Sequence, residues 1–131
     1  MLFRSWSEAR GIRLLSLGYR TSWADEQRIE AGPGEFAGLM AGASAVVTNF
    51  FHGCFFALLN GKPLATAPSD YRFNKVRDLA AKLDLRHRIV GADTSQESFN
   101  ALLDTPIEAA THALIRDYRR RSQDYLDAAL A

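Results

Sequence analysis

Cysteine, histidine and long apolar runs are scarce in this chain of 131 residues. Its one cysteine, Cys54, cannot form an internal disulfide, which is typical of a protein kept in the cytoplasm. No apolar stretch reaches the roughly 18 residues of a membrane span, and no amino-terminal segment resembles an export signal. Because His52, His87 and His112 lie far apart in the sequence, no metal-binding spacing appears. We therefore expect a cytoplasmic protein without a membrane span, a metal or another cofactor.

Neither sign of charge dominates the chain. The 16 lysines and arginines nearly balance the 15 aspartates and glutamates, which gives a formal net charge of +1 at pH 7. A protein that binds nucleic acid usually carries a basic field, so we expect no nucleic-acid partner. The local run Arg119–Arg121 is typical of the solvated face of a helix.

The most informative segment, residues 43–68, alternates apolar runs with sharp turns. Ala45–Thr48 is apolar and β-branched without alternation, which predicts a strand covered on both faces. His52–Asn60 predicts a buried helix that a Gly-Lys-Pro turn ends, and Leu64–Ala67 predicts the next strand. His52 then lies where a parallel strand ends and a helix begins. Open α/β sheets bind ligands at such places, and the helix amino end attracts anions.

Three residues of this segment each allow two interpretations. His52 suits chemistry on an anionic group, but a histidine among phenylalanines also fits a core residue bonded to a backbone carbonyl. Gly53 permits either close approach of a ligand or tight packing. Cys54 could serve as a thiol nucleophile, whereas its apolar neighbours favour a buried, inert thiol.

The rest of the chain alternates strand and helix signals. Met1–Arg10 is predicted to be the end of a helix, and Tyr19–Gly34 a loop rich in charge and glycine. Further strands are predicted at Gly11–Leu17 and Arg88–Val90, and further helices at Glu35–Ala41, Phe73–Leu83, Ser95–Leu102 and Pro106–Leu130. This order predicts an α/β fold, with a parallel sheet flanked by helices and joined by right-handed crossovers, in a single domain over residues 1–131.

Several longer stretches add a more specific pattern. They are Pro33–Phe36, Thr48–Gly53, Asn60–Pro63, Arg72–Leu79 and Arg121–Leu126. Together they make the chain, from about Gly11 to its end, resemble the carboxy-terminal half of the polysaccharide pyruvyl transferase family.

This resemblance implies a fold and an activity. Members of the family have two Rossmann-like halves of the glycosyltransferase B type, and they transfer a pyruvyl group from phosphoenolpyruvate to a sugar as a ketal. The chain would then be the carboxy-terminal Rossmann-like domain, with the amino-terminal half absent. It departs from the family at Phe50, where relatives often carry serine or arginine. If an arginine there helps to hold the donor anion in some relatives, this protein makes that contact with another residue or not at all.

The resemblance also implies roles for individual residues. The family's Phe-His-Gly histidine lies in the cleft, so His52 would transfer protons, for which its ordinary pKa is suited. Arg72 and Lys75 would bind the phosphate or carboxylate of the donor, or would simply be solvated. Asn49 would orient sugar hydroxyls or cap the following helix, and Gly53 would allow close approach of the substrate.

Because this chain would supply only one half of a two-domain cleft, the resemblance implies a further partner. A separate amino-terminal chain or a second copy of this chain would cover the exposed sheet edge and interdomain face. Two other functions stay open: a non-catalytic module that binds a sugar or a nucleotide, and a glycosyltransferase of the same fold that uses a nucleotide sugar.

Overall fold

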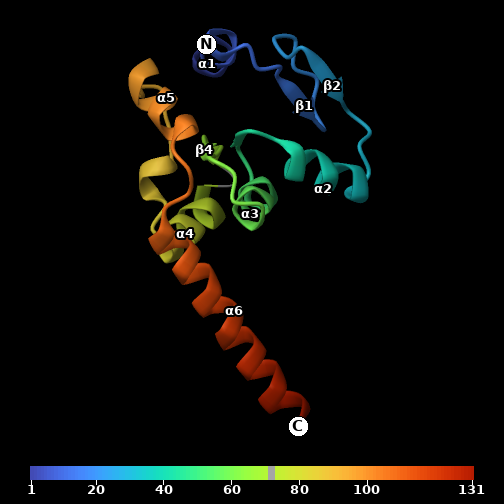
Figure 1. Cartoon of the computed structure of the whole chain (residues 1–131), viewed down its shortest axis with the longest axis vertical. Coiled ribbons are helices and arrows are strands. Elements are labelled where there is room, and N and C mark those ends of the chain that lie inside the picture. The colour runs from blue at the N-terminus through green and yellow to red at the C-terminus, as the bar shows by residue number, and fades with distance from the viewer. Residues whose placement is uncertain (71–72) are drawn as a thin grey trace.

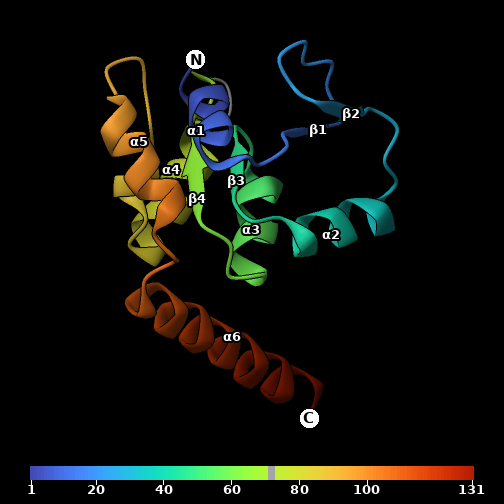
Figure 2. The same cartoon turned by 45° about the horizontal axis from the view of Figure 1, so that its top comes forward.

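The protein combines helices with short parallel strands, as Figures 1 and 2 show for the computed structural model. The structure describes residues 1–70 and 73–131. In chain order the elements are α1 (Leu2–Arg10), β1 (Leu15–Leu17), β2 (Glu26–Arg28), α2 (Pro33–Gly42), β3 (Val46–Thr48), α3 (Phe51–Leu59), β4 (Leu64–Thr66), α4 (Phe73–Leu83), the 3₁₀ helix η2 (Arg86–Arg88), α5 (Gln96–Asp104) and α6 (Ala109–Leu130).

The β3–α3–β4 unit lies at the centre of the fold and confirms the predicted strand, helix and strand. The two strands pair in parallel, with Val46 opposite Leu64 and Thr48 opposite Thr66. All residues of β4 are buried, which explains its apolar sequence without alternation. Gly61 follows α3 with a φ of 63°, a left-handed conformation that glycine adopts at little cost.

The predicted loop Tyr19–Gly34 is wrong in part, because it contains the strand β2. This strand pairs in parallel with β1, which is itself shorter than the predicted Gly11–Leu17. Strand β2 carries the polar sequence Glu-Gln-Arg, so no hydrophobic alternation marks it. Ion pairs hold its side chains instead, since Arg28 contacts Glu26 at 2.6 Å and Glu35 at 2.8 Å.

The predicted fourth strand, Arg88–Val90, is also wrong. The segment forms η2 and then a single parallel bridge between Ile89 and Thr66. The described strands form two separate two-stranded sheets, β1–β2 and β3–β4, and not the one continuous sheet that the sequence predicts. The fourth strand is missing because the side chain of Arg88 is fully buried at this point and its backbone ends the 3₁₀ helix η2.

The predicted helices are confirmed, with small changes at their ends. Helix α4 spans the predicted residues 73–83, and Ser95 caps α5 by accepting a hydrogen bond from the Ser98 backbone N–H at 3.1 Å. The predicted helix Pro106–Leu130 is confirmed as α6, which begins at Ala109. Figures 1 and 2 show α6 leaving the body of the protein and running on past the other helices.

Two clusters of buried side chains form the core. The larger one packs α3 and α4 against β3, β4 and the residues before α6. The smaller one packs α1 and α5 against Ala65 of β4. Trp6 and Arg10 of α1 reinforce the smaller cluster by both donating hydrogen bonds to the Asp104 carboxylate, at 3.0 and 2.7 Å. Arg10 therefore holds the pKa of Asp104 below its ordinary value.

A fully buried arginine, Arg88, joins β4 to the segment between α5 and α6. Its guanidinium donates hydrogen bonds of 2.9 to 3.1 Å to the backbone carbonyls of Leu64, Leu102, Thr105 and Pro106 and to the Glu108 carboxylate. We call this cluster the Arg88 joint. Partial burial alone would raise the pKa of Glu108, but hydrogen bonds from His87, its own backbone and Arg88 outweigh this effect and lower it to about 2.

Candidate functional site

The candidate site begins where β3 ends and α3 starts, at residues 49–53. Phe50 has an extended backbone and precedes the first helical residue, Phe51. The first turn of a helix leaves backbone N–H groups without helical partners, and its partial positive charge favours an anion. The fold therefore places a helix amino end where the sequence predicts one.

Asn49 does not cap this helix, so one of its two predicted roles is wrong. The capping position belongs to Phe50, and no side chain makes a capping hydrogen bond there. Asn49 is exposed, and its side-chain amide makes no hydrogen bond within the described part of the chain. Its amide is therefore available to a ligand.

His52 is exposed, which excludes the interpretation as a core histidine. Its ring meets the ring of Phe51 edge to face, with 5.6 Å between the centroids. No hydrogen bond fixes its imidazole among residues 1–70 and 73–131. Within this part of the chain, both ring nitrogens are open to a ligand.

Gly53 is required by tight packing, one of the two interpretations of its sequence position. A Cβ atom there would lie 2.3 Å from Oγ1 and 2.8 Å from Cβ of Thr48. The missing side chain lets α3 lie directly against the end of β3, and this contact fixes the position of the site's first helical turn.

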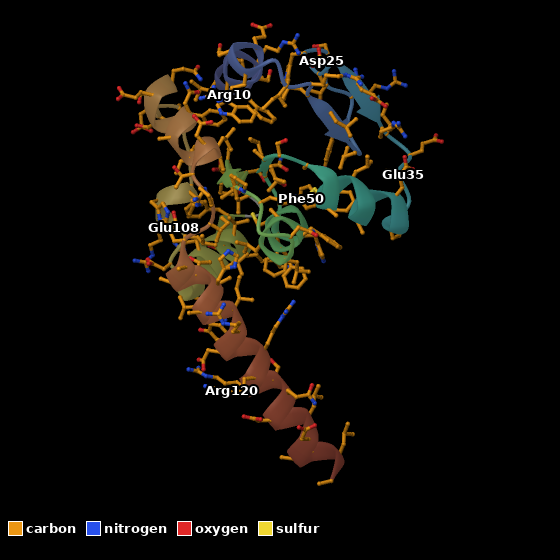
Figure 3. All side chains as sticks on the ribbon, in the orientation of Figure 1. Arg10, Asp25, Glu35, Phe50, Glu108 and Arg120 are labelled. Carbon is orange, nitrogen blue, oxygen red and sulfur yellow. The ribbon has the colours of Figure 1, made fainter. Side chains whose placement is uncertain are left out.

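A cavity of about 360 Å³ adjoins this turn. Its walls include β1 and β3 along their whole length, together with Asn49, Phe50 and Gly53. Figure 3 labels Phe50 beside α3. Two aromatic side chains of the loop after β1, Tyr19 and Trp23, also line it and remain about half exposed. His52 is not among its described lining residues, so it lies at the same turn but beside the cavity.

The cavity wall is mostly apolar and aromatic. Its polar side chains are hydroxyls and one amide, from Ser16, Tyr19, Thr21, Thr48 and Asn49, and no charged side chain lines it among the described residues. Such a wall suits a neutral ring with polar substituents better than a bare anion. Tyr19 and Trp23 were not predicted from the sequence as wall residues, although two large aromatic residues in a polar loop were an available signal.

The predicted cationic residues give a partial picture. Arg72 lies outside the described residues. Lys75 is exposed on α4, outside the described cavity wall, and makes no ion pair within the described part of the chain. The nearby Arg77 guanidinium stacks over the Phe73 ring at 5.5 Å. Lys75 thus keeps both predicted roles, a donor ligand or a solvated charge.

Cys54 follows the site but faces the core. It is buried, and burial raises the pKa of its thiol. A reactive cysteine needs the opposite environment, one that is accessible and stabilises the thiolate. The structure therefore supports the inert thiol and not the nucleophile.

Within residues 1–70 and 73–131, no three histidine, cysteine, aspartate or glutamate side chains come together that could hold a metal ion. In the same part of the chain, every helix is too short or too polar to cross a lipid bilayer.

Comparison with known proteins identifies one family. Residues 4–71 match the family described as Polysaccharide pyruvyl transferase. The matched segment runs from within α1 past β4 and contains Asn49–Gly53 and, apart from Phe3, the residues that line the cavity. Arg72, Lys75 and the closing segment Arg121–Leu126 lie beyond it. No curated protein and no solved structure matches the chain significantly.

Proposed function

Because the chain belongs to the polysaccharide pyruvyl transferase family, we propose that it takes part in transferring a pyruvyl group from phosphoenolpyruvate to a sugar of a cell-surface polysaccharide. The chain would act in the cytoplasm as the carboxy-terminal, Rossmann-like domain of a fold of the glycosyltransferase B type. The observation that carries the proposal is the turn at Asn49–Gly53, where an accessible histidine and a helix amino end adjoin a mostly apolar cavity whose polar side chains are neutral.

The reaction needs a group that moves protons, and we assign this role to His52. The enol carbon of phosphoenolpyruvate gains a proton, two sugar hydroxyls attack in turn and lose theirs, and inorganic phosphate leaves. A histidine placed to transfer such protons typically contributes about 10²- to 10⁴-fold to a rate. His52 would thus be the catalytic residue of this half of the site.

The two substrates differ in charge, and the site offers a different surface to each. The first turn of α3, with Lys75 and Arg72, would receive the phosphate and carboxylate of the donor. Phe50 brings no charge to the position where relatives often carry arginine, so the donor depends on these other groups. The neutral cavity would receive the sugar, with its ring on Tyr19 or Trp23 and its hydroxyls toward Asn49.

Gly53 acts here through its missing side chain. Any Cβ would push α3 away from Thr48 and displace the turn that presents His52. A complete cleft needs a second wall to exclude water. We propose that this wall comes from an amino-terminal half, on a longer chain or on a separate subunit.

The test is calorimetric titration of the 131-residue chain with phosphoenolpyruvate and with a nucleotide sugar. We expect phosphoenolpyruvate to bind and His52→Ala to weaken it, whereas His112→Ala, which changes a histidine on α6, leaves binding unchanged. If only the nucleotide sugar gives a heat of binding, the result would favour the glycosyltransferase or the non-catalytic binding module. The neutral cavity wall supports these two alternatives. Silence with both ligands would contradict a donor site in this chain.

A further inference from the structure

The far half of α6 exposes apolar side chains that nothing in the described structure covers. The helix has 22 residues, a length of about 33 Å at 1.5 Å per residue. Figures 1 and 2 show its far half standing clear of the other helices, and Figure 3 marks Arg120 on this stretch. Tyr125 is 74% exposed and Leu130 is 82% exposed. Helices in proteins gain most of their stability from packing against other elements, so a partner on this stretch would stabilise it.

The same helix forms one wall of an apolar groove. The groove has a volume of about 640 Å³ and lies between α3, α4 and α6. Phe55 and Leu59 of α3 line it and are each about two-fifths exposed, and Tyr118 and Leu126 of α6 line the opposite wall. Its charged lining residues are Lys82 and Arg119, and no acidic side chain lines it among the described residues. A groove of this kind fits an amphipathic helix with an acidic flank.

The far half of α6 has that chemistry. It carries Tyr125, Leu126 and Leu130 as apolar side chains, and Asp127 lies one turn beyond the groove residue Gln123 and accepts its amide N–H at 2.7 Å. The molecule therefore holds both a basic apolar groove and an unpartnered helix with an acidic flank.

We propose that two copies of this chain dimerise through α6, with the far half of each helix in the groove of the other copy. The helices run antiparallel and cross near Ser122 and Gln123, where small or flexible side chains allow close approach. In this arrangement Asp127 of one copy is level with Arg119 of the other, and the pair occurs twice because the interface is symmetric. A parallel arrangement would set like charges side by side, so the charge pattern selects the antiparallel one.

The carboxyl end of each helix gains a further contact in this arrangement. Helix carboxyl ends carry partial negative charge and favour nearby cations. The antiparallel crossing carries this end toward the part of the groove where α4 contributes Lys82. The dimer therefore covers the apolar stretch and also offsets the charge at its end.

Sedimentation velocity of the full chain across the micromolar range tests the dimer. We expect a species of twice the 14.6 kDa chain mass that dissociates on dilution. Leu126→Asp should give a monomer, whereas Ala128→Asp, an equal charge change on the opposite face of α6, should leave the dimer intact. A chain that stays monomeric throughout would overturn the proposal and leave the groove to a different partner. The proposal would also be overturned if Leu126→Asp dimerised as strongly as the unchanged chain.

A charge exchange tests the antiparallel arrangement. We expect Asp127→Arg and Arg119→Asp each to weaken dimerisation by about tenfold, because each sets two like pairs across the interface. The double variant restores opposite charges and should return to within about threefold of the unchanged chain. Far-ultraviolet circular dichroism confirms that α6 is intact in each variant. Failure of the double variant to recover would overturn the antiparallel pairing.

Discussion

The turn at Asn49–Gly53 and the Arg88 joint use polar residues in opposite ways. At the joint, Arg88 has no exposed surface and donates to four carbonyls and a carboxylate. At the turn, Asn49 and His52 are exposed and make no side-chain hydrogen bond within the described residues. Groups that are already paired stabilise the fold, and groups left free can bind a ligand. The Arg88 joint therefore stabilises the fold, whereas the turn at Asn49–Gly53 is available for function.

The largest expected effect comes from breaking the joint. Arg88→Met leaves four carbonyls and Glu108 without their shared donor, so we expect the free energy of unfolding to fall by about 3 to 5 kcal/mol. Urea denaturation followed by circular dichroism measures this change. Arg86→Met, an exposed neighbour in η2, should change it by less than about 0.5 kcal/mol. Equal effects at the two positions would contradict the structural role of Arg88.

The next effect tests the packing under the turn. Gly53→Ala places a methyl group 2.3 Å from Thr48 Oγ1, so we expect a loss of about 1 to 3 kcal/mol in stability. Gly38→Ala in α2 meets nothing within 4 Å and should stabilise the helix by about 0.5 to 1 kcal/mol. Thermal unfolding measures both changes. Adding Thr48→Ala should recover part of the loss at Gly53, and no recovery would show that the clash lies elsewhere.

A smaller effect appears at acid pH. The folded state lowers the pKa of Glu108 from 4.5 to about 2, so the stability from its ionised form is present above about pH 4.5 and is lost as the pH falls toward 2. Urea midpoints at several pH values measure this loss. Glu108→Gln should flatten the profile in that window, whereas Glu97→Gln on α5 should not. An unchanged profile in Glu108→Gln would contradict its pairing at the joint.

The smallest effect on stability belongs to the proposed catalytic residue. His52 is exposed, so His52→Ala should change the free energy of unfolding by less than about 0.5 kcal/mol. The same denaturation series measures it beside Arg88→Met. A loss as large as that at Gly53 would mean that His52 supports the fold and would remove the basis of the comparison.

Much of the fold could be predicted from the sequence because its strongest signals are periodic. The buried strands β3 and β4 and the amphipathic helix α4 follow such patterns. The elements that were predicted wrongly have no such periodic pattern. Strand β2 is polar and is held by ion pairs. The buried position of Arg88 depends on four carbonyls from two distant parts of the chain, β4 and residues 102–106.

The candidate site was only partly predictable. Its position at the end of β3 followed from the strand and helix pattern, and so did the placement of His52 in the first helical turn. The cavity wall did not, because Tyr19 and Trp23 come from a loop whose path no local pattern determines. Nor could the sequence choose between packing and ligand approach at Gly53; only the distance to Thr48 shows the packing.

The buried thiol of Cys54 can report how often the β3–α3–β4 unit opens. Because the chain has one cysteine and that cysteine is buried in α3, a thiol reagent can react only when α3 lifts from the strands beneath it. The rate at which the reagent modifies Cys54 therefore measures how often the β3–α3–β4 unit opens, and no probe has to be engineered into the protein. A ligand seated at the amino end of this helix would slow that rate in proportion to how firmly it holds the unit closed.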